Sequence, residues 1–209
     1  LKKEGIDLKR IIFSGDVMYD QFLYVISHSV DNFSEKYPKD FILMTWHRQE
    51  NTCSKNRMEK MISFLEKVKY KIIFPMHPRT GKLLVEYGLW ERVKTNDNLV
   101  IIAPVGYKEM IILLSRCKLL ITDSGGVSKE ASFVGKKCFF TLRLDVWPEL
   151  MEQGYINIVD IEDNKSLQYN IEEIEDIIRM NKSMDKPSCF GNGNAVEIII
   201  DTVEKALRL

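Results

Sequence analysis

Short apolar runs recur along this chain, and a stretch with helical periodicity separates each run from the next. The runs are apolar throughout and do not alternate with polar residues, which is typical of strands buried on both faces. Strands that alternate with helices predict a parallel sheet with right-handed crossovers, and hence a doubly wound, Rossmann-like α/β fold. The expected strands are Arg10–Phe13, Phe41–Thr45, Lys71–Pro75, Leu99–Ala103, Leu119–Thr122, Lys137–Thr141 and Ile156–Val159.

The expected helices occupy the intervals between these strands and the region after the last one. They are predicted at Val17–Phe33, Ser54–Val68, Gly81–Glu91, Tyr107–Arg116, Val127–Val134, Pro148–Gln153, Ile171–Met180 and Ala195–Leu207. The proline and glycines of residues 185–194 indicate a surface connection before the final helix.

Composition narrows the classes of partner. The 30 basic and 30 acidic residues of the 209-residue chain cancel, which argues against a nucleic-acid or membrane surface as the main partner. No run reaches the roughly 18 apolar residues of a membrane span. The four cysteines form no CxxC pair, so reduced thiols and a cytoplasmic location are expected. No metal-ligand spacing and no GxGxxG fingerprint is present, so neither a metal nor another cofactor is predicted.

Polar residues follow five consecutive predicted strands. Ligands of doubly wound sheets bind at the carboxyl ends of the strands, so these residues are expected to share one rim. His47 and His77 both lie there, each close to an arginine. The five segments are Thr45–Asn51, Met76–Thr80, Pro104–Tyr107, Asp123–Gly126 and Leu142–Asp145.

The segment Thr122–Glu130 combines a strand end, a Gly-Gly turn and a helix start. Free backbone N–H groups and the positive end of the helix dipole favour an anion at such a point. Ser124, Gly125 and Gly126 are therefore candidates to hold a phosphate, and Glu130 is a candidate to accept hydrogen bonds from a ribose diol. The alternative is that the glycines merely turn the chain and Ser124 caps the helix.

The other rim candidates also have two interpretations. The histidines either bind substrate and transfer protons, or are satisfied locally, at a strand end and beside a proline. The arginines match the oxygens of a diphosphate but are also typical of a solvated surface. These candidates are His47, Arg48, Glu50, His77, Arg79 and Arg143.

Taken together, the motifs resemble the UDP-N-acetylglucosamine 2-epimerase family, chiefly its non-hydrolysing bacterial branch. They run in the order of the family from about residue 10 to residue 207. The matching stretches are Gly15–Asp20, Thr45–Thr52, Pro75–Thr80, Pro104–Tyr107, Thr122–Glu130, Trp147–Leu150 and Phe190–Ala195.

The resemblance implies the two-domain glycosyltransferase-B architecture, with this chain as its C-terminal half. Residues 1–34 would be the end of an N-terminal domain that is missing here, residues 35–190 a UDP-binding Rossmann-like domain, and residues 191–209 a helix that crosses back to the missing domain. An exposed apolar patch is expected on the first and last of these segments. The missing domain is thus an expected partner, and the resemblance also implies a homodimer.

The family interconverts UDP-N-acetylglucosamine and UDP-N-acetylmannosamine by removing the C2 proton, expelling UDP and reversing the addition on the other face. The resemblance implies UDP and UDP-N-acetylhexosamine as ligands, with Ser124, Gly125 and Gly126 at the diphosphate and Glu130 at the ribose. It assigns the histidines to the catalytic rim. The catalytic carboxylates of the family lie in the missing domain, so this chain is expected to bind UDP weakly and to catalyse nothing alone.

One loop departs from the family pattern. Residues 143–147 are one residue shorter than usual and lack a Thr-Glu pair, for which Asp145 substitutes in part. Two alternatives stay open, and this departure slightly favours the second. The chain is either part of a hydrolysing epimerase or glycosyltransferase on the same scaffold, or a non-catalytic remnant that binds nucleotide sugars.

Overall fold

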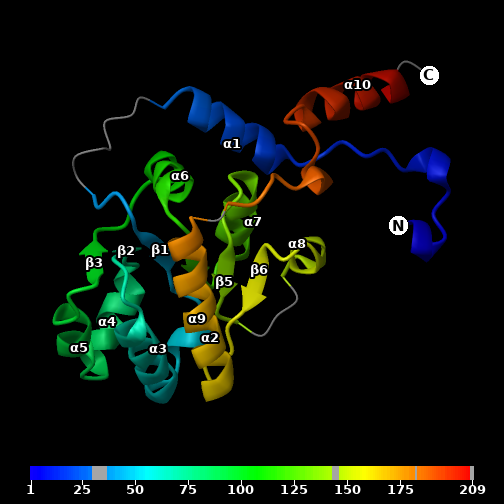
Figure 1. Ribbon diagram of the computed structural model, residues 1–209. Helices are drawn as coiled ribbons and strands as arrows, with labels where there is room; N and C mark the ends of the chain where they lie inside the picture. Colours follow the sequence, from blue (N-terminus) through cyan, green and yellow to red (C-terminus); the bar gives the residue numbers. More distant parts are fainter. Residues whose placement is uncertain (30–36, 143–145, 182, 208–209) are drawn as a thin grey trace. The chain divides into compact units, whose positions relative to one another are not determined.

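The chain consists of two compact units in the computed structural model, which describes residues 1–29, 37–142, 146–181 and 183–207. One unit comprises residues 29–187, and the other combines residues 1–28 with residues 188–209. Figure 1 shows the elements of both units along the chain.

The larger unit is built on a six-stranded parallel sheet with the order β3-β2-β1-β4-β5-β6. Chain order reverses between β1 and β4, which is the switch point of a doubly wound sheet. The predicted fold class and six of the predicted strands are therefore confirmed. The strands are β1 Ile42–Thr45, β2 Ile72–Pro75, β3 Leu99–Ile102, β4 Leu120–Thr122, β5 Cys138–Phe140 and β6 Ile156–Ile158.

The helices between the strands agree with the prediction in position more than in their bounds. The helix α4 begins at Pro78, because His77 caps it and proline suits the first helical position. The helix α9 begins at Asn164, where Asp163 accepts a hydrogen bond from the Lys165 N–H. The short helices α2 and α5 were not predicted as separate elements. The helices of this unit are α2 Gln49–Thr52, α3 Lys55–Lys67, α4 Pro78–Glu86, α5 Trp90–Lys94, α6 Tyr107–Arg116, α7 Gly125–Phe133, α8 Pro148–Glu152 and α9 Asn164–Met180.

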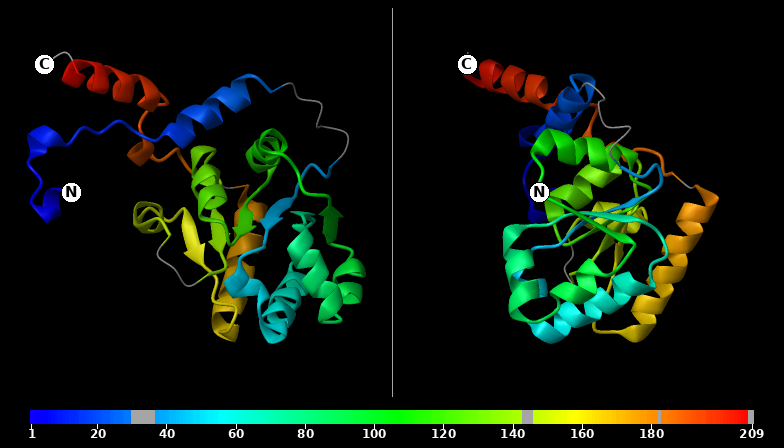
Figure 2. Two further views of the ribbon diagram at one scale, coloured as in Figure 1. Left: turned by 180° about the vertical axis from the view of Figure 1, so that it is seen from behind. Right: turned by 90° about the vertical axis from the view of Figure 1, so that its left-hand side faces the viewer.

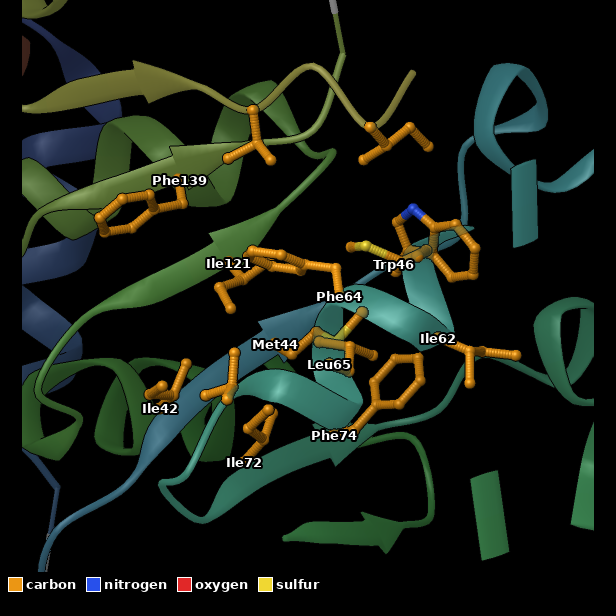
Figure 3. Packing of buried hydrophobic residues seen from close by; sticks show 14 of the residues in the cluster. Ile42, Met44, Trp46, Ile62, Phe64, Leu65, Ile72, Phe74, Ile121 and Phe139 are labelled. Carbon is orange, nitrogen blue, oxygen red and sulfur yellow. The ribbon is translucent and has the colours of Figure 1, made fainter. Parts of the chain in front are cut away.

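One face of the sheet packs against α3 and α9. Alternate residues of each strand point to this face, as the pleat requires. They form a single buried cluster with the apolar stripes of the two helices, which also contact each other. Figure 3 shows this packing around Ile42, Met44, Ile72, Phe74, Ile121 and Phe139 of the sheet and Ile62, Phe64 and Leu65 of α3.

The remaining residues of each strand point to the opposite face, where α6 and α7 contact each other. Leu43, Ile73 and Leu120 are fully buried in the strands of the sheet.

Cys117 and Cys138 are also fully buried, and both are free thiols. Burial raises the pKa of the Cys117 thiol to about 12. Both cysteines are therefore inert core residues. The two views in Figure 2 show the sheet with its covering helices.

The smaller unit contains the helices α1 (Val17–Ser27) and α10 (Ala195–Leu207), and the 3-10 turns η1 (Lys2–Glu4), η2 (Leu8–Arg10) and η3 (Ser188–Phe190). The Asp20 carboxylate of α1 caps α10, because it accepts hydrogen bonds from the Ala195 and Val196 N–H groups at 3.1 and 2.8 Å. The prediction of α10 is confirmed. The helix predicted at Val17–Phe33 is confirmed from Val17 to Ser27, where it ends earlier than predicted with His28 as its C-cap, and residues 30–33 of that prediction lie outside the described residues.

The strand predicted at Arg10–Phe13 is wrong. Its first residue lies in the turn η2, which Asp7 caps, and the following residues pair with no strand among the described parts of the chain. Ile12 and Phe13 are 58% and 68% exposed. An exposed segment can hydrogen-bond to water instead, and a β-strand needs a neighbouring strand to pair with, which is not described beside this segment.

Many exposed large apolar side chains belong to the smaller unit, as expected for its first and last segments. Large apolar side chains on the surface of a monomer commonly mark an interface. In residues 1–28 they include Leu8, Ile12, Phe13, Val17 and Tyr24, and on α10 they are Val196, Ile199, Ile200, Val203 and Leu207.

Across the described residues, no helix has both the length and the apolar character that a transmembrane segment needs.

Candidate functional site

The switch point lies at the carboxyl ends of β1 and β4, which run side by side. Thr45 and Thr122, the last residues of the two strands, are register partners, and their hydroxyl oxygens lie 2.5 Å apart. Beyond this pair, the segment after β1 leads to α3 on one face of the sheet, and the segment after β4 leads to α7 on the opposite face. The residues that follow the two strands, Trp46–His47 and Asp123–Ser124, therefore line the crevice where doubly wound sheets bind ligands.

Asp123 organises this crevice. Its carboxylate is fully buried and accepts hydrogen bonds from the backbone N–H groups of His47 and Arg48 at 2.9 and 2.8 Å. The Asn51 amide donates a third hydrogen bond at 3.1 Å. A buried carboxylate is tolerated because donors surround it, and in return it fixes the path of the chain after β1.

Asn51 extends this network to the next strand. Its amide also donates to the Thr141 hydroxyl at 3.1 Å, directly beyond β5. Its oxygen accepts a hydrogen bond at 3.0 Å from Nε of Arg57, whose guanidinium lies 3.6 Å from Glu162. Every member is satisfied, so the network holds three adjacent strand ends rigidly.

His47 and His77 come together above the sheet, as the shared rim predicted. Their rings stack with centroids 5.6 Å apart. Nδ1 of His47 lies 3.6 Å from the Asp123 carboxylate. Nδ1 of His77 accepts a hydrogen bond from the Arg79 N–H at 3.2 Å, so in the neutral ring the proton lies on Nε2. His77 therefore caps α4 locally and also lies on the rim beside His47.

Thr80 connects the turn that carries His77 to the turn that carries His47. It is fully buried, and its hydroxyl donates to the Trp46 carbonyl at 2.7 Å. This hydrogen bond joins α4 to the end of β1 and thereby sets the spacing of the two imidazoles.

A small pocket opens in front of the histidine pair. Its volume is about 170 Å³, and residues from the ends of β1, β2 and β3 and from the first turns of α6 and α7 line it. The walls are largely apolar, with the two imidazoles as polar groups, a composition typical of ligand pockets. Its lining residues are Thr45, His47, Pro75, His77, Pro104, Val105, Met110 and Val127.

The N-terminus of α7 lies beside this pocket. The helix begins at Gly125, two residues earlier than predicted, so Gly125 and Gly126 belong to its first turn and Ser124 is the N-cap residue. The first-turn N–H groups of a helix have no partner within it, which makes this end a ready anion site. A Cβ on Gly125 would lie 3.0 Å from the Val146 methyl group, so a side chain there would crowd its neighbour.

Two further side chains fix this end of α7. The Trp147 indole N–H donates to the Gly125 carbonyl at 2.7 Å. The ammonium of Lys129 lies 4.5 Å from the centre of the Trp147 ring, a cation–π contact, although Lys129 itself is only 5% exposed.

Glu130 lies deeper along α7 and is 4% exposed. It accepts a hydrogen bond at 2.8 Å from the hydroxyl of Tyr107, the first residue of α6. Burial raises the pKa of the Glu130 carboxyl, and the hydrogen bond from Tyr107 opposes that rise. A buried carboxylate whose pKa is raised by desolvation is a candidate functional group.

The remaining predicted residues are less closely held. Arg48 and Glu50 are exposed at the start of α2, and Arg79 is exposed in the first turn of α4. Their charged groups make no hydrogen bond or ion pair with another described residue, so they face solvent and remain available to a ligand. Arg143 and Asp145 lie outside the described residues.

Three side chains of the site, Asp123, Asn51 and Tyr107, were not predicted individually from the sequence. Asp123 stood in the Gly-Gly motif, but its role depends on two N–H groups 75 residues away or more along the chain. Within the described parts of the chain, no group of three or more histidine, cysteine or acidic side chains could hold a metal ion.

Comparison with known proteins identifies the relatives of this arrangement. The sequence model of the UDP-N-acetylglucosamine 2-epimerase family matches residues 1–204. A curated relative from Methanococcus maripaludis, named as a homolog of that enzyme, is 38% identical over 210 residues, 97% of this chain and 57% of the relative. A UDP-2,3-diacetamido-2,3-dideoxy-D-glucuronate 2-epimerase from Pseudomonas aeruginosa is 38% identical over 159 residues, 74% of this chain and 43% of that enzyme.

Solved structures agree. The crystal structure of the Methanocaldococcus jannaschii UDP-GlcNAc 2-epimerase in complex with UDP-GlcNAc and UDP superimposes with a TM-score of 0.83 at 30% identity. The match covers 98% of this chain and 57% of that protein. The chain thus spans about half the length of the relatives that it matches, and its fold is the Rossmann-like domain of the glycosyltransferase-B type.

Proposed function

The chain belongs to the UDP-N-acetylglucosamine 2-epimerase family, and from this premise we propose that it is the C-terminal, UDP-binding half of a non-hydrolysing 2-epimerase. One observation carries the proposal: the N-terminus of α7, where Ser124 makes no side-chain capping hydrogen bond within the described residues, lies at the switch point of the sheet, beside a stacked pair of histidines. This arrangement offers a place for an anion next to two groups that can exchange protons.

The diphosphate of the nucleotide is the proposed ligand of α7. Ser124, Gly125 and Gly126 supply the N-cap and the first-turn N–H groups. Glu130, on the same helix, is the proposed acceptor for the ribose hydroxyls. The exposed guanidinium groups of Arg48 and Arg79, together with Arg143, are proposed to add positive charge around the phosphates.

The proposed reaction interconverts UDP-N-acetylglucosamine and UDP-N-acetylmannosamine. A base takes the C2 proton, the electron pair forms the C1–C2 double bond, and the C1–O bond breaks to release UDP and a 2-acetamidoglucal. Return of UDP to C1 and of a proton to the opposite face of C2 gives the epimer. Negative charge grows on the departing diphosphate, and the α7 dipole stabilises it most at that stage.

His47 and His77 are proposed to face the sugar end of the substrate, with Glu50 supporting them from α2. A neutral His77 carries its proton on Nε2 and can donate a hydrogen bond to a leaving oxygen. The carboxylates that handle the C2 proton are proposed to belong to an N-terminal domain, so this chain alone is proposed to bind UDP and to catalyse nothing.

The apolar side chains exposed on α10 and on residues 1–28 support the proposal of an absent half. Val196, Ile199, Ile200 and Val203 recur at helical spacing along α10 and would bury one continuous stripe against a partner. The N-terminal domain is the proposed partner. A homodimer of the complete enzyme is a further proposal, which the mass of the particle in solution would test.

A second substrate is favoured by one relative. The Pseudomonas aeruginosa enzyme is named for a UDP sugar that carries a 3-acetamido group and a carboxylate, and it is as identical to this chain as the Methanococcus relative. A UDP-2,3-diacetamido sugar acid is therefore the second candidate. The diphosphate and ribose contacts would stay the same, and the exposed arginines would meet the carboxylate of the sugar.

Incubation with each UDP sugar in D2O tests the proposal. The chain alone is expected to leave the C2 proton and the sugar unchanged, whereas the chain mixed with a separately expressed N-terminal half is expected to exchange C2–H for deuterium and to form the 2-epimer. Free N-acetylmannosamine and UDP would instead indicate a hydrolysing enzyme, and a glycoside would indicate a transferase. Turnover by this chain alone would contradict the proposed division of labour.

A further inference from the structure

The buried carboxylate of Glu130 is held by a neighbour that no motif assigned to it. The Tyr107 hydroxyl donates to Oε1 of Glu130 at 2.8 Å. Tyr107 is 43% exposed and Glu130 is 4% exposed, so the ring reaches inward from the surface to meet a carboxylate that water hardly touches.

Local structure fixes both partners. Tyr107 occupies the first position of α6, directly after the residues that line the pocket beside the histidines. Glu130 lies in the second turn of α7, whose first turn holds the two glycines. Because α6 and α7 pack against each other, the hydrogen bond joins the two helices that flank this side of the crevice.

We propose that Tyr107 is a positioning residue that holds Glu130 as an oriented, ionised acceptor for the ribose hydroxyls of a nucleoside diphosphate. The inference rests on the proposed function, since it takes the ribose as the ligand of Glu130. The Tyr107 hydroxyl donates a hydrogen bond to one carboxylate oxygen of Glu130 and thereby restrains rotation of the Glu130 side chain. The second carboxylate oxygen is then held in a fixed direction. A ribose diol then meets a preorganised acceptor instead of a mobile one.

The charges around Glu130 give this role a measurable consequence. Burial raises the pKa of Glu130, and the two groups that oppose this rise are the Tyr107 hydroxyl from α6 and the Lys129 ammonium on α7. Removal of the hydroxyl takes away the larger opposing effect, so the carboxyl of a Tyr107→Phe variant is expected to titrate at a higher pH. A phenol ring that served only as packing would leave this titration where it was.

The first test follows Glu130 without any ligand. In the full chain labelled at the glutamate carboxyl carbons, the NMR signal of Glu130 is assigned by its loss in Glu130→Gln and then followed through a pH titration. Tyr107→Phe is expected to shift its midpoint upward. Tyr169→Phe is the matched control, because Tyr169 is 63% exposed on the remote helix α9. An equal midpoint in Tyr107→Phe and the parent chain would overturn the proposal.

The second test compares UDP with 2′,3′-dideoxy-UDP by calorimetry. The parent chain is expected to bind UDP about tenfold more tightly than the dideoxy compound, the worth of a hydrogen bond to a charged acceptor. Tyr107→Phe is expected to lose most of that preference. An unchanged preference in the variant contradicts the inference. Failure of the parent chain to bind UDP at all would instead contradict the proposed function, while the carboxyl titration still decides the role of Tyr107.

Discussion

Replacement of Asp123 by alanine tests the structural centre of the site. The carboxylate is fully buried and accepts hydrogen bonds from the His47 N–H, the Arg48 N–H and the Asn51 amide. Alanine removes the acceptor of all three hydrogen bonds at once. The two backbone N–H groups then lose the partner that holds the turn after β1, and no other side chain of the network can replace it.

The size of the effect follows from these contacts. A hydrogen bond to a charged group contributes about 1.5–3 kcal/mol, so three contribute roughly 4–9 kcal/mol before other effects are counted. Loss of the carboxylate also removes the penalty of burying it, which is several kcal/mol. We expect Asp123→Ala to lower the free energy of unfolding by about 3 kcal/mol, the difference of these two contributions.

Urea unfolding followed by tryptophan fluorescence measures this loss, because all three tryptophans lie in the larger unit. With a slope of about 3 kcal/mol per molar urea, the midpoint is expected to fall by about 1 M. Asp97→Ala, an exposed aspartate of the same unit, is the matched control and is expected to change the free energy by less than about 0.5 kcal/mol. A midpoint of Asp123→Ala equal to that of the control would refute the role assigned to this carboxylate.

Three further predictions follow from the contacts. At neutral pH, Glu130→Gln is expected to raise the free energy of unfolding by about 0.5–2 kcal/mol while weakening UDP binding. Burial raises the pKa of the Glu130 carboxyl in the folded state above its value in the unfolded chain. The parent chain therefore loses stability as the pH rises from the unfolded-state pKa to the folded-state pKa, and the advantage of Glu130→Gln vanishes below that window. Unfolding of both chains at several pH values measures this difference. Thr80→Val removes the hydrogen bond to the Trp46 carbonyl and is expected to cost about 1–3 kcal/mol in thermal unfolding, with Thr95→Val as the exposed comparison. Ile200→Lys with Val203→Lys is expected to reduce binding of a hydrophobic dye without changing the urea midpoint of the larger unit; undiminished dye binding would show that the α10 stripe is not the exposed surface.

The sheet was predictable because its strands are buried on both faces. Runs such as Leu119–Thr122 have no polar residue that breaks them, and only a parallel sheet covered by helices buries such runs completely. The bounds of the helices were harder to predict where polar residues begin them. The helix α9 starts at Asn164, where the polar neighbouring residues show no apolar periodicity. The helix α4 starts at Pro78, and a proline at that place is equally consistent with a turn.

The site was predictable as a rim but not as a network. The order of strands and helices alone placed His47 and His77 at neighbouring strand ends, and the structure stacks their rings. The partners of Asp123 and Glu130 come from other elements of the chain, and the nearest of them is 23 residues away. Hydrogen bonds over such separations depend on three-dimensional packing, which local spacing does not encode. The prediction of a strand at Arg10–Phe13 was wrong for the same reason, because a strand requires a paired neighbour and local sequence does not show whether one is present.

Backbone amide NMR of the uniformly 15N-labelled chain, titrated with UDP and with uridine, tests the central claim most directly. The account predicts that UDP shifts the amide signals of Ser124, Gly125, Gly126 and Val127, that uridine at the same concentration leaves them nearly unmoved, and that Gly126→Trp abolishes the UDP response. Shifts confined to other parts of the chain, or equal shifts with uridine, would contradict a diphosphate site at the N-terminus of α7.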